Sequence, residues 1–89
     1  MNFNGKTAIS TGAASGMGLL FSQNFAELGG NIVMCDVNEP VLSEKVAEIN
    51  SKGKGKAIGV ICDVRDYNQV SDTVNKAIEA FGSVDIMIN

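Results

Sequence analysis

The sequence predicts an α/β fold built on a parallel sheet, and three observations lead to that prediction. Four short apolar runs, rich in β-branched residues, alternate along the 89-residue chain with three segments of helical periodicity. None of the four runs alternates cleanly between apolar and polar residues, which is typical of strands covered on both faces. The connections are short, so strand–helix–strand units with right-handed crossovers follow. The composition, with 45% hydrophobic and 19% charged residues, excludes disordered, collagen-like and disulfide-stapled chains.

The expected strands are the four apolar runs, which cover residues 7–11, 31–37, 57–64 and 84–88. Each of the three segments between them has an apolar stripe at three- and four-residue steps, which predicts a helix with that stripe in the core. The stripes consist of Met17, Phe21, Phe25 and Leu28 in the first helix, Leu42, Val46 and Ile49 in the second, and Val70, Val74, Ala77, Ile78 and Phe81 in the third.

Local signals indicate where the helices begin and end. Gly29 stops the first helix, and an Asn-Glu-Pro sequence at residues 38–40 suits a capped start of the second. Asp66 and Gln69 form the pattern of a capping box at the start of the third helix, and Gly82 suits its C-terminal cap.

The charge balance argues against nucleic acid as a partner. Seven Lys and Arg residues stand against ten Asp and Glu residues, whereas binding to a phosphate backbone needs a basic face. The one basic cluster, Lys52, Lys54 and Lys56, is interleaved with glycines but lacks the spacing of a phosphate-binding loop. We interpret it as a solvated connection between a helix and a strand.

The cysteines and termini restrict the chemistry further. The sequence has no histidine and only two cysteines, Cys35 and Cys62, so neither a common zinc site nor a histidine-based triad is expected. Both cysteines lie in apolar runs and are expected to be small buried hydrophobic residues in a reducing compartment. The sequence has neither a signal-peptide pattern nor an apolar stretch of membrane-spanning length, which predicts a cytoplasmic chain without a membrane partner.

A glycine-rich loop leaves the first strand and opens the first helix. Gly12 permits the tight turn off the strand, Gly16 allows a ligand to approach the backbone, and Gly18 allows the helix to pack closely on the sheet. The N–H groups and positive dipole end of the helix then face any anion bound there. The alternative interpretation is a strand-to-helix turn that binds nothing.

An acidic residue strengthens the interpretation as a dinucleotide site. Asp36 follows Gly18 by 18 residues and ends the second expected strand. An acid at this place can accept hydrogen bonds from both ribose hydroxyls of a dinucleotide, whereas a 2′-phosphate would meet it as a like charge. Because Ser15, rather than a basic residue, precedes Gly16, we predict NAD in preference to NADP. The alternative for Asp36 is an ordinary solvated turn residue.

With these motifs the whole chain resembles the short-chain dehydrogenase/reductase family. The loop Thr-Gly-x-x-x-Gly-x-Gly of that family matches residues 11–18, with Met17 where isoleucine is commoner. The family's acid after the second strand matches Asp36, and its Asp-Val pair after the third strand matches residues 63–64. Residues 85–89 are similar to the run that leads into the family's Asn-Asn-Ala-Gly, of which the first Asn is Asn89.

The resemblance implies the N-terminal half of a Rossmann-type, doubly wound parallel sheet with strand order 3-2-1-4 and three crossover helices. It also implies a set of residues that bind NAD. Gly12, Ser15, Gly16, Met17 and Gly18 would line the pyrophosphate and the adenosine ribose. Asp36 and Val37 would hold the ribose and flank the adenine, and Asp63 and Val64 would bind the adenine edge. Asn89 would contact the adenosine side.

Catalysis in the family depends on a Tyr-x-x-x-Lys pair with a Ser and an Asn. The sequence has one tyrosine, Tyr67, and the residue four positions later is Ser71 rather than lysine. We therefore interpret Tyr67 as a surface or packing residue and expect no catalytic residue in this chain.

The combined expectation is a truncated NAD-binding half-domain over residues 1–89. The full enzyme would transfer a hydride between nicotinamide and a small alcohol or ketone, and the family resemblance implies a homodimer or homotetramer. The alternatives are a self-contained nucleotide-binding or interaction module without catalysis and, less consistent with the glycine spacing, a methyltransferase-type domain. The apolar, unprotected strand at residues 86–88 favours the first interpretation and predicts association of the isolated chain through that edge.

Overall fold

The computed structural model describes residues 2–88, and its elements alternate as the sequence predicts. The strands are parallel and are ordered β3-β2-β1-β4, which confirms the predicted half of a doubly wound sheet. The elements are β1 (Thr7–Thr11), α1 (Gly16–Glu27), β2 (Asn31–Asp36), α2 (Glu39–Ser51), β3 (Lys56–Ile61), α3 (Tyr67–Phe81) and β4 (Ile86–Ile88). β2 ends one residue earlier than predicted, β3 begins one residue earlier and ends three residues earlier, and β4 begins two residues later.

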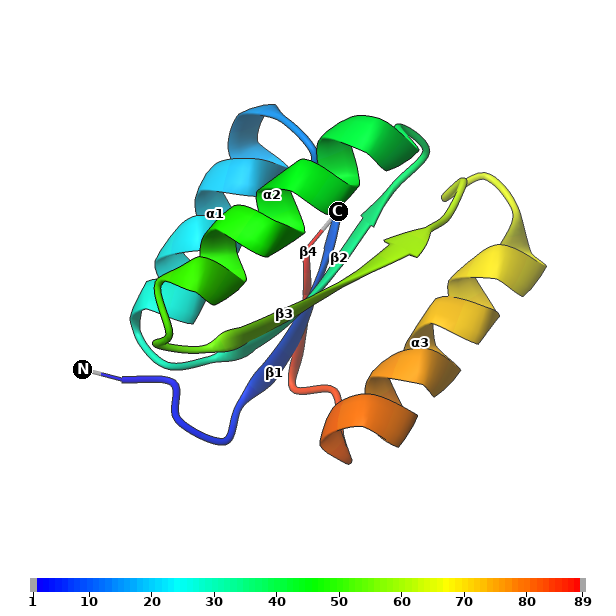
Figure 1. Ribbon diagram of the computed structural model, residues 1–89. Coiled ribbons are helices and arrows are strands. Elements are labelled where there is room, and N and C mark those ends of the chain that lie inside the picture. Colours follow the sequence, from blue (N-terminus) through cyan, green and yellow to red (C-terminus); the bar gives the residue numbers. More distant parts are fainter. Residues whose placement is uncertain (1, 89) are drawn as a thin grey trace.

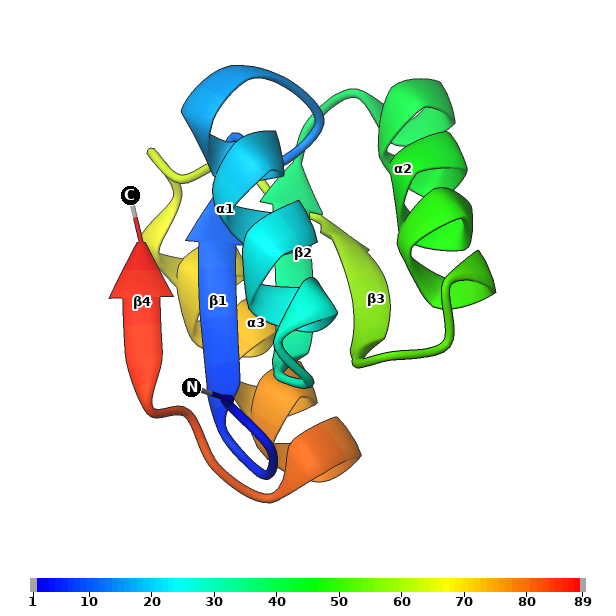
Figure 2. The ribbon, with the colours of Figure 1, turned by 90° about the vertical axis from the view of Figure 1, so that its left-hand side faces the viewer.

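Helices cover the sheet on both faces. Figure 1 shows α1 and α2 on one side of the strands and α3 on the other, and Figure 2 shows the four strands side by side with α1 in front. Phe25, Ile32 and Leu42 belong to the core under α1 and α2, whereas Ile9 and Val33 belong to the core under α3. The alternation of side chains along each strand therefore feeds two separate apolar layers.

Burial on both faces, which was predicted for all four strands, holds only for the two central ones. Residues 8–10 and 32–35 are fully buried, whereas β3 and β4 are edge strands with exposed positions such as Ile61 and Met87. The prediction that the apolar stripes are core is wrong at three positions, since Met17 is 79% exposed, Ile78 47% and Leu28 37%. Met17 lies in the first turn of α1, above the end of the sheet, where no strand lies beneath it.

The outer edge of β3 is partly covered by a side chain of α2. The Asn50 amide donates to the carbonyl of Ala57 at 2.9 Å and accepts from its N–H at 2.8 Å, so it replaces a neighbouring strand at that residue. Coverage of the edge by Asn50 reduces the ability of β3 to pair with a further strand.

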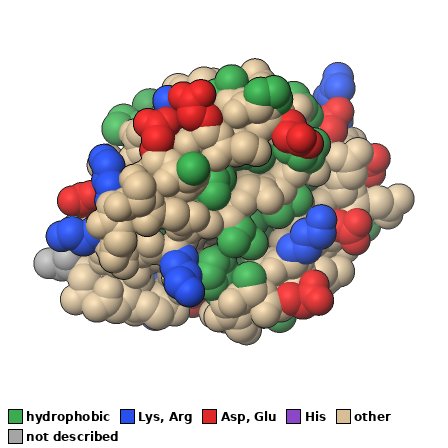
Figure 3. Space-filling model, in the orientation of Figure 1, with side chains coloured by type: hydrophobic (Ala, Val, Ile, Leu, Met, Phe, Trp, Pro, Cys, Tyr) green, Lys and Arg blue, Asp and Glu red, His purple; other side chains and the backbone are tan. Residues whose placement is uncertain are grey.

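On the face seen in Figure 3, hydrophobic side chains gather in the middle of the surface with charged side chains around them.

The predicted caps form, with one difference in the box. Asp66 accepts from the N–H groups of Asn68 and Gln69, and Gly82 ends α3 with a φ of 88°, in the left-handed region. The Gln69 side chain, however, reaches back to the N–H of Asp63 at 2.8 Å rather than to that of Asp66. The Asp66 and Gln69 side chains therefore fix the chain segment between β3 and α3 as well as capping α3.

The start of β4 is fixed to the start of β1. The Asp85 carboxylate accepts from the N–H of Thr7 at 2.9 Å, and the N–H of Asp85 donates to the Thr7 carbonyl at 2.8 Å. Met87 is 41% exposed on this edge strand, and the predicted association through it stays a prediction. No helix among the described residues is long and apolar enough to cross a membrane.

Candidate functional site

The candidate site lies where the strands end. β1, β2 and β3 all point their carboxyl ends to the same edge of the sheet, at the top of Figure 2, and the glycine loop arches over that edge. In the order β3-β2-β1-β4, β2 and β3 lie on one side of β1 and β4 lies on the other, so the direction of winding reverses at β1. Ligands of open α/β sheets bind outside the carboxyl ends of strands at such a switch point.

The glycine loop has the backbone geometry that its three glycines predict. Gly12 and Gly16 have φ angles of 59° and 58°, in the region that other residues rarely adopt, and a side chain added at either would meet nothing within 4 Å. Gly18 has no such space, because a Cβ there would lie 2.6 Å from the carbonyl oxygens of both Gly12 and Thr11. The first two glycines thus leave open room above the loop, and the third allows α1 to approach β1.

The N-terminus of α1 is available to an anion. Ser15 is the N-cap residue, and among the described residues neither its hydroxyl nor an acidic side chain in the first turn caps the helix. The unpaired N–H groups and the helix dipole therefore give this end a partial positive charge. A phosphate oxygen is the kind of group that satisfies such an end.

Two buried hydroxyls, which the sequence analysis did not identify, hold α1 against β1. Ser10 and Ser22 are both fully buried, and their hydroxyls donate to the carbonyl of Gly18 at 3.0 and 2.8 Å. A serine within an apolar strand, together with a serine four residues after the last loop glycine, was the available signal. These bonds fix the position of the first turn of α1.

Asp36 connects the end of β2 to the glycine loop. Its carboxylate accepts from the N–H of Ala14 at 2.9 Å and from the N–H of Asn38 at 3.0 Å. Burial acts to raise the pKa of this carboxyl, but the N–H groups of Asn38, Ala14 and Val37 outweigh burial and hold the pKa below its usual value of 3.8. Asp36 is thus ionised and oriented at neutral pH.

The Asp36 contacts predict a pH-dependent contribution to stability. The pKa of Asp36 is lower in the folded chain than in the unfolded chain. The ionised carboxylate therefore stabilises the fold fully above pH 3.8, and this stabilisation is lost as the pH falls through the lowered pKa. Asp36→Asn should cost about 1 kcal/mol at neutral pH, because backbone N–H groups bond more strongly to a charged acceptor than to a neutral one. Urea unfolding of both proteins between pH 2 and 7 measures this difference, which should shrink below pH 3.8. A difference that grows with acid would contradict the assignment.

An acidic residue and a basic residue lie together at the end of β3. The Asp63 carboxylate accepts from the Arg65 guanidinium at 3.0 and 2.8 Å and from the Arg65 N–H at 3.0 Å. The side-chain hydrogen bonds from Arg65 are the main cause that lowers the pKa of Asp63 to about 2. Val64, between them, is half exposed.

The predicted site residues that the structure describes lie along one edge of the sheet. A cavity of about 280 Å³ joins the ends of β1, β2 and β3, and Ser15, Gly16, Met17 and Gly18 continue the loop from its rim. Asn89, the last predicted member, lies outside the described residues. The residues that line the cavity are Gly12, Asp36, Val37, Cys62, Asp63, Val64 and Arg65. Of these, Cys62 and Arg65 were not among the site residues predicted from the sequence.

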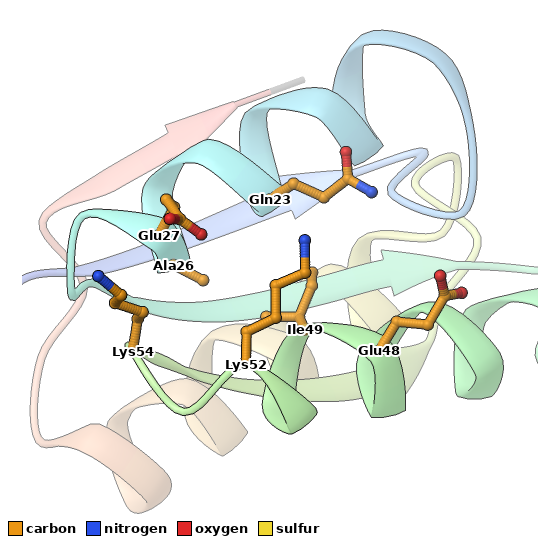
Figure 4. A pocket seen from close by; sticks show the side chains of 7 residues that line it. All are labelled: Gln23, Ala26, Glu27, Glu48, Ile49, Lys52 and Lys54. Atoms are coloured by element: carbon orange, nitrogen blue, oxygen red, sulfur yellow. The ribbon is translucent and has the colours of Figure 1, made fainter.

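A smaller hollow lies between α1 and α2. Figure 4 shows Gln23 and Glu27 from α1, Glu48 from α2, and Lys52 and Lys54 from the following loop around it. Its volume of about 40 Å³ is room for a water molecule or two. It is therefore much too small for a nucleotide.

The two cysteines are buried and unpaired by a disulfide, as expected for small apolar residues. Burial, followed by the neighbouring Cys62, raises the pKa of the Cys35 thiol to about 12. The Cys35 thiol points to the Cys62 carbonyl at 3.9 Å. A protonated, buried thiol is a poor nucleophile, so Cys35 contributes packing rather than chemistry.

Comparisons with known proteins agree with this geometry. The 2,5-dichloro-2,5-cyclohexadiene-1,4-diol dehydrogenase of Sphingobium indicum is 39% identical over 85 residues, which are 96% of this chain and 34% of that enzyme. The (S)-acetoin-forming diacetyl reductase of Staphylococcus epidermidis is 39% identical over 84 residues, which are 94% of this chain and 32% of that enzyme. The chain thus spans about a third of the length of these curated relatives.

Solved structures show the same fold. A short chain dehydrogenase/reductase from Burkholderia phymatum in complex with NAD superposes with a TM-score of 0.92 at 39% identity, over 98% of this chain and 31% of that one. L-Sorbose reductase from Gluconobacter frateurii, complexed with NADPH and L-sorbose, gives a TM-score of 0.92 at 31% identity, over 100% of this chain and 34% of that one. The sequence profile described as short chain dehydrogenase matches residues 6–89. The chain therefore belongs to the short-chain dehydrogenase/reductase family, of which it is an N-terminal, Rossmann-type part.

Proposed function

We propose that residues 1–89 form the NAD-binding part of an oxidoreductase that transfers a hydride between nicotinamide and an alcohol or ketone. The observation that carries this proposal is the contact between Asp36 and the glycine loop. An ionised carboxylate at the end of β2, bonded to the N–H of Ala14, places a ribose acceptor directly beside the phosphate-binding loop.

The residues present fit such a cofactor. The N-terminal N–H groups of α1 suit the pyrophosphate, and the open space above Gly12 and Gly16 gives it room. Asp36 suits the ribose hydroxyls, and Asp63 with the Val64 N–H suits the edge of adenine. When bound, the cofactor supplies the hydride chemistry, and these residues hold its adenosine half.

The preference for NAD over NADP rests on charge. Asp36 is ionised, and a 2′-phosphate at the same ribose would be repelled by it. Arg65, the basic residue that lines the cavity, is already paired with Asp63. One of the similar structures holds NAD and the other NADPH, so Asp36 is the feature that supports the choice.

The substrate is expected to be a small alcohol or ketone, in line with the diol and diacetyl named for the relatives. The family's Tyr-x-x-x-Lys pair has no match here, since Tyr67 is 82% exposed and is followed four residues later by Ser71. We therefore assign catalysis to no residue of this chain.

A titration and an assay on the 89-residue chain test the proposal together. We expect calorimetry to show weak NAD binding, because the contacts to adenosine are present and those to nicotinamide are not. We expect no NADH production with any alcohol. Absence of NAD binding by a folded chain would contradict the cofactor assignment, and turnover by the pure chain would contradict the assignment of catalysis.

A further inference from the structure

We propose that Arg65 is a positioning residue that holds the Asp63 carboxylate in place and thereby sets a preference for adenine over other purines. The inference rests on the proposed function, since it concerns the base end of the same cavity. Nothing in the family motif, which covers residues 63 and 64, calls for an arginine at position 65.

The contact between the two side chains is a planar fork. The Arg65 Nε donates to Oδ1 of Asp63 at 3.0 Å, and Nη2 donates to Oδ2 at 2.8 Å. A bidentate pair fixes the carboxylate in one plane, which a single-point ammonium cannot do. The Arg65 N–H adds a third bond to Oδ1 at 3.0 Å, so side chain and backbone hold the same group.

The backbone of Asp63 is held as well. Its N–H donates to the Gln69 side chain at 2.8 Å, and its carbonyl accepts from the N–H of Asp66 at 3.0 Å. Gln69 is itself bonded to the Asp66 carboxylate at 3.2 Å. The carboxylate of Asp63 therefore projects from a braced turn, and Arg65 fixes its remaining side-chain freedom.

The fork leaves one direction open for a ligand. Among residues 2–88, Oδ1 accepts two N–H groups and Oδ2 accepts one, so Oδ2 keeps a lone pair for a ligand. The Arg65 side chain is 87% exposed and Asp63 31% exposed, and both line the cavity that Asp36 also lines. Oδ2 of this oriented carboxylate can thus accept a hydrogen bond from an incoming N–H donor.

This arrangement discriminates between purines by the group at position 6. The amino group of adenine donates and suits Oδ2, whereas the carbonyl of hypoxanthine accepts and would face the negative charge. A carboxylate that Arg65 holds still cannot turn away from the wrong base. Without the fork from Arg65 the Asp63 side chain is free to rotate away from the carbonyl of hypoxanthine, so the penalty against that base falls.

The experiment compares binding of NAD and of nicotinamide hypoxanthine dinucleotide by calorimetry at pH 7. Wild type is expected to prefer NAD, and Arg65→Ala should reduce this ratio about tenfold, the worth of one hydrogen bond to a charged group. Arg65→Lys, which keeps the charge without the fork, should recover only part of the ratio. Lys76→Ala, which removes one positive charge from an exposed position on α3, is the matched control and should leave the ratio unchanged.

The outcomes separate this inference from the proposed function. If wild type and Arg65→Ala bind NAD with the same preference over the hypoxanthine analogue, the role of Arg65 is overturned and the NAD site stands. Equal weakening of both ligands in Arg65→Ala also overturns it, because it indicates a general loss of charge. If folded wild type binds neither ligand, the proposed function fails and this inference fails with it.

Discussion

Gly18→Ala is expected to destabilise the chain by about 3 kcal/mol and to remove NAD binding, since overpacking against fixed atoms costs this much. The added Cβ would lie 2.6 Å from two carbonyl oxygens, those of Gly12 and Thr11. Both belong to backbone, so no side chain can rotate away. The helix or the loop must move, and the bonds from Ser10 and Ser22 to the Gly18 carbonyl are strained with it.

The loss exceeds what alanine gains as a better helix former. That gain is about 1 kcal/mol in a helix interior, and the net effect is a large part of the stability of a domain this small. Thermal and urea unfolding measure the stability, and calorimetry with NAD measures the site.

Gly59→Ala is the matched control for this substitution. A Cβ at that position on β3 meets side-chain atoms of Val46 and Leu42 at 3.2 and 3.3 Å, so a shift of a few tenths of an ångström in these side chains, rather than in backbone, relieves the contact. Its cost should stay at about 1 kcal/mol, the lower end of the range for an added methyl group in a packed layer. Equal destabilisation by the two substitutions would contradict the close approach of α1 to β1 as the reason for Gly18.

Local pattern was sufficient to predict the order of the elements. The apolar runs and helical stripes depend on periodicities that are visible within a dozen residues, so strand and helix alternate as expected. The positive φ angles of Gly12 and Gly82 follow from the same local reasoning, because only glycine adopts them readily. Strand order needed the family resemblance, since pairing between distant strands leaves no local signal.

The errors arise where burial depends on distant neighbours. Met17 fits the helical stripe of α1 but lies above the end of the sheet, and Ile78 fits that of α3 but is half exposed. β3 has the apolar composition of a central strand, yet it is an edge strand whose outer side is covered at Ala57 by Asn50. Periodicity identifies which residues share a face and cannot tell how far the opposite layer extends.

The candidate site was predicted as separate positions, and the structure adds the bonds between them. The sequence indicates Asp36 as a ribose acceptor, but its bond to the N–H of Ala14 joins residues 22 positions apart. The fork between Arg65 and Asp63 depends on side-chain rotamers within a turn, which no spacing rule specifies. Such contacts decide which predicted residues are oriented and ionised.

Asp36→Ala is expected to reduce NAD affinity tenfold or more, about the worth of hydrogen bonds to a charged group, while NADP affinity changes much less. In the proposed complex the carboxylate would accept from the ribose hydroxyls of NAD and would repel the 2′-phosphate of NADP. Its removal therefore takes away an attraction in one case and a repulsion in the other. The ratio of the two dissociation constants, measured by calorimetry, isolates this effect.

The ratio is needed because Asp36 has a second task. Its bond to the N–H of Ala14 braces the glycine loop, so Asp36→Ala should weaken both ligands through the loop as well. Asp36→Asn keeps an acceptor for that N–H and removes the charge, so it should shift the ratio with less loss of overall affinity. Asp72→Ala makes the same substitution as Asp36→Ala at an exposed position on α3 and should leave the ratio as in wild type. If neither change at Asp36 moves the ratio, its carboxylate braces the loop and does not select the cofactor.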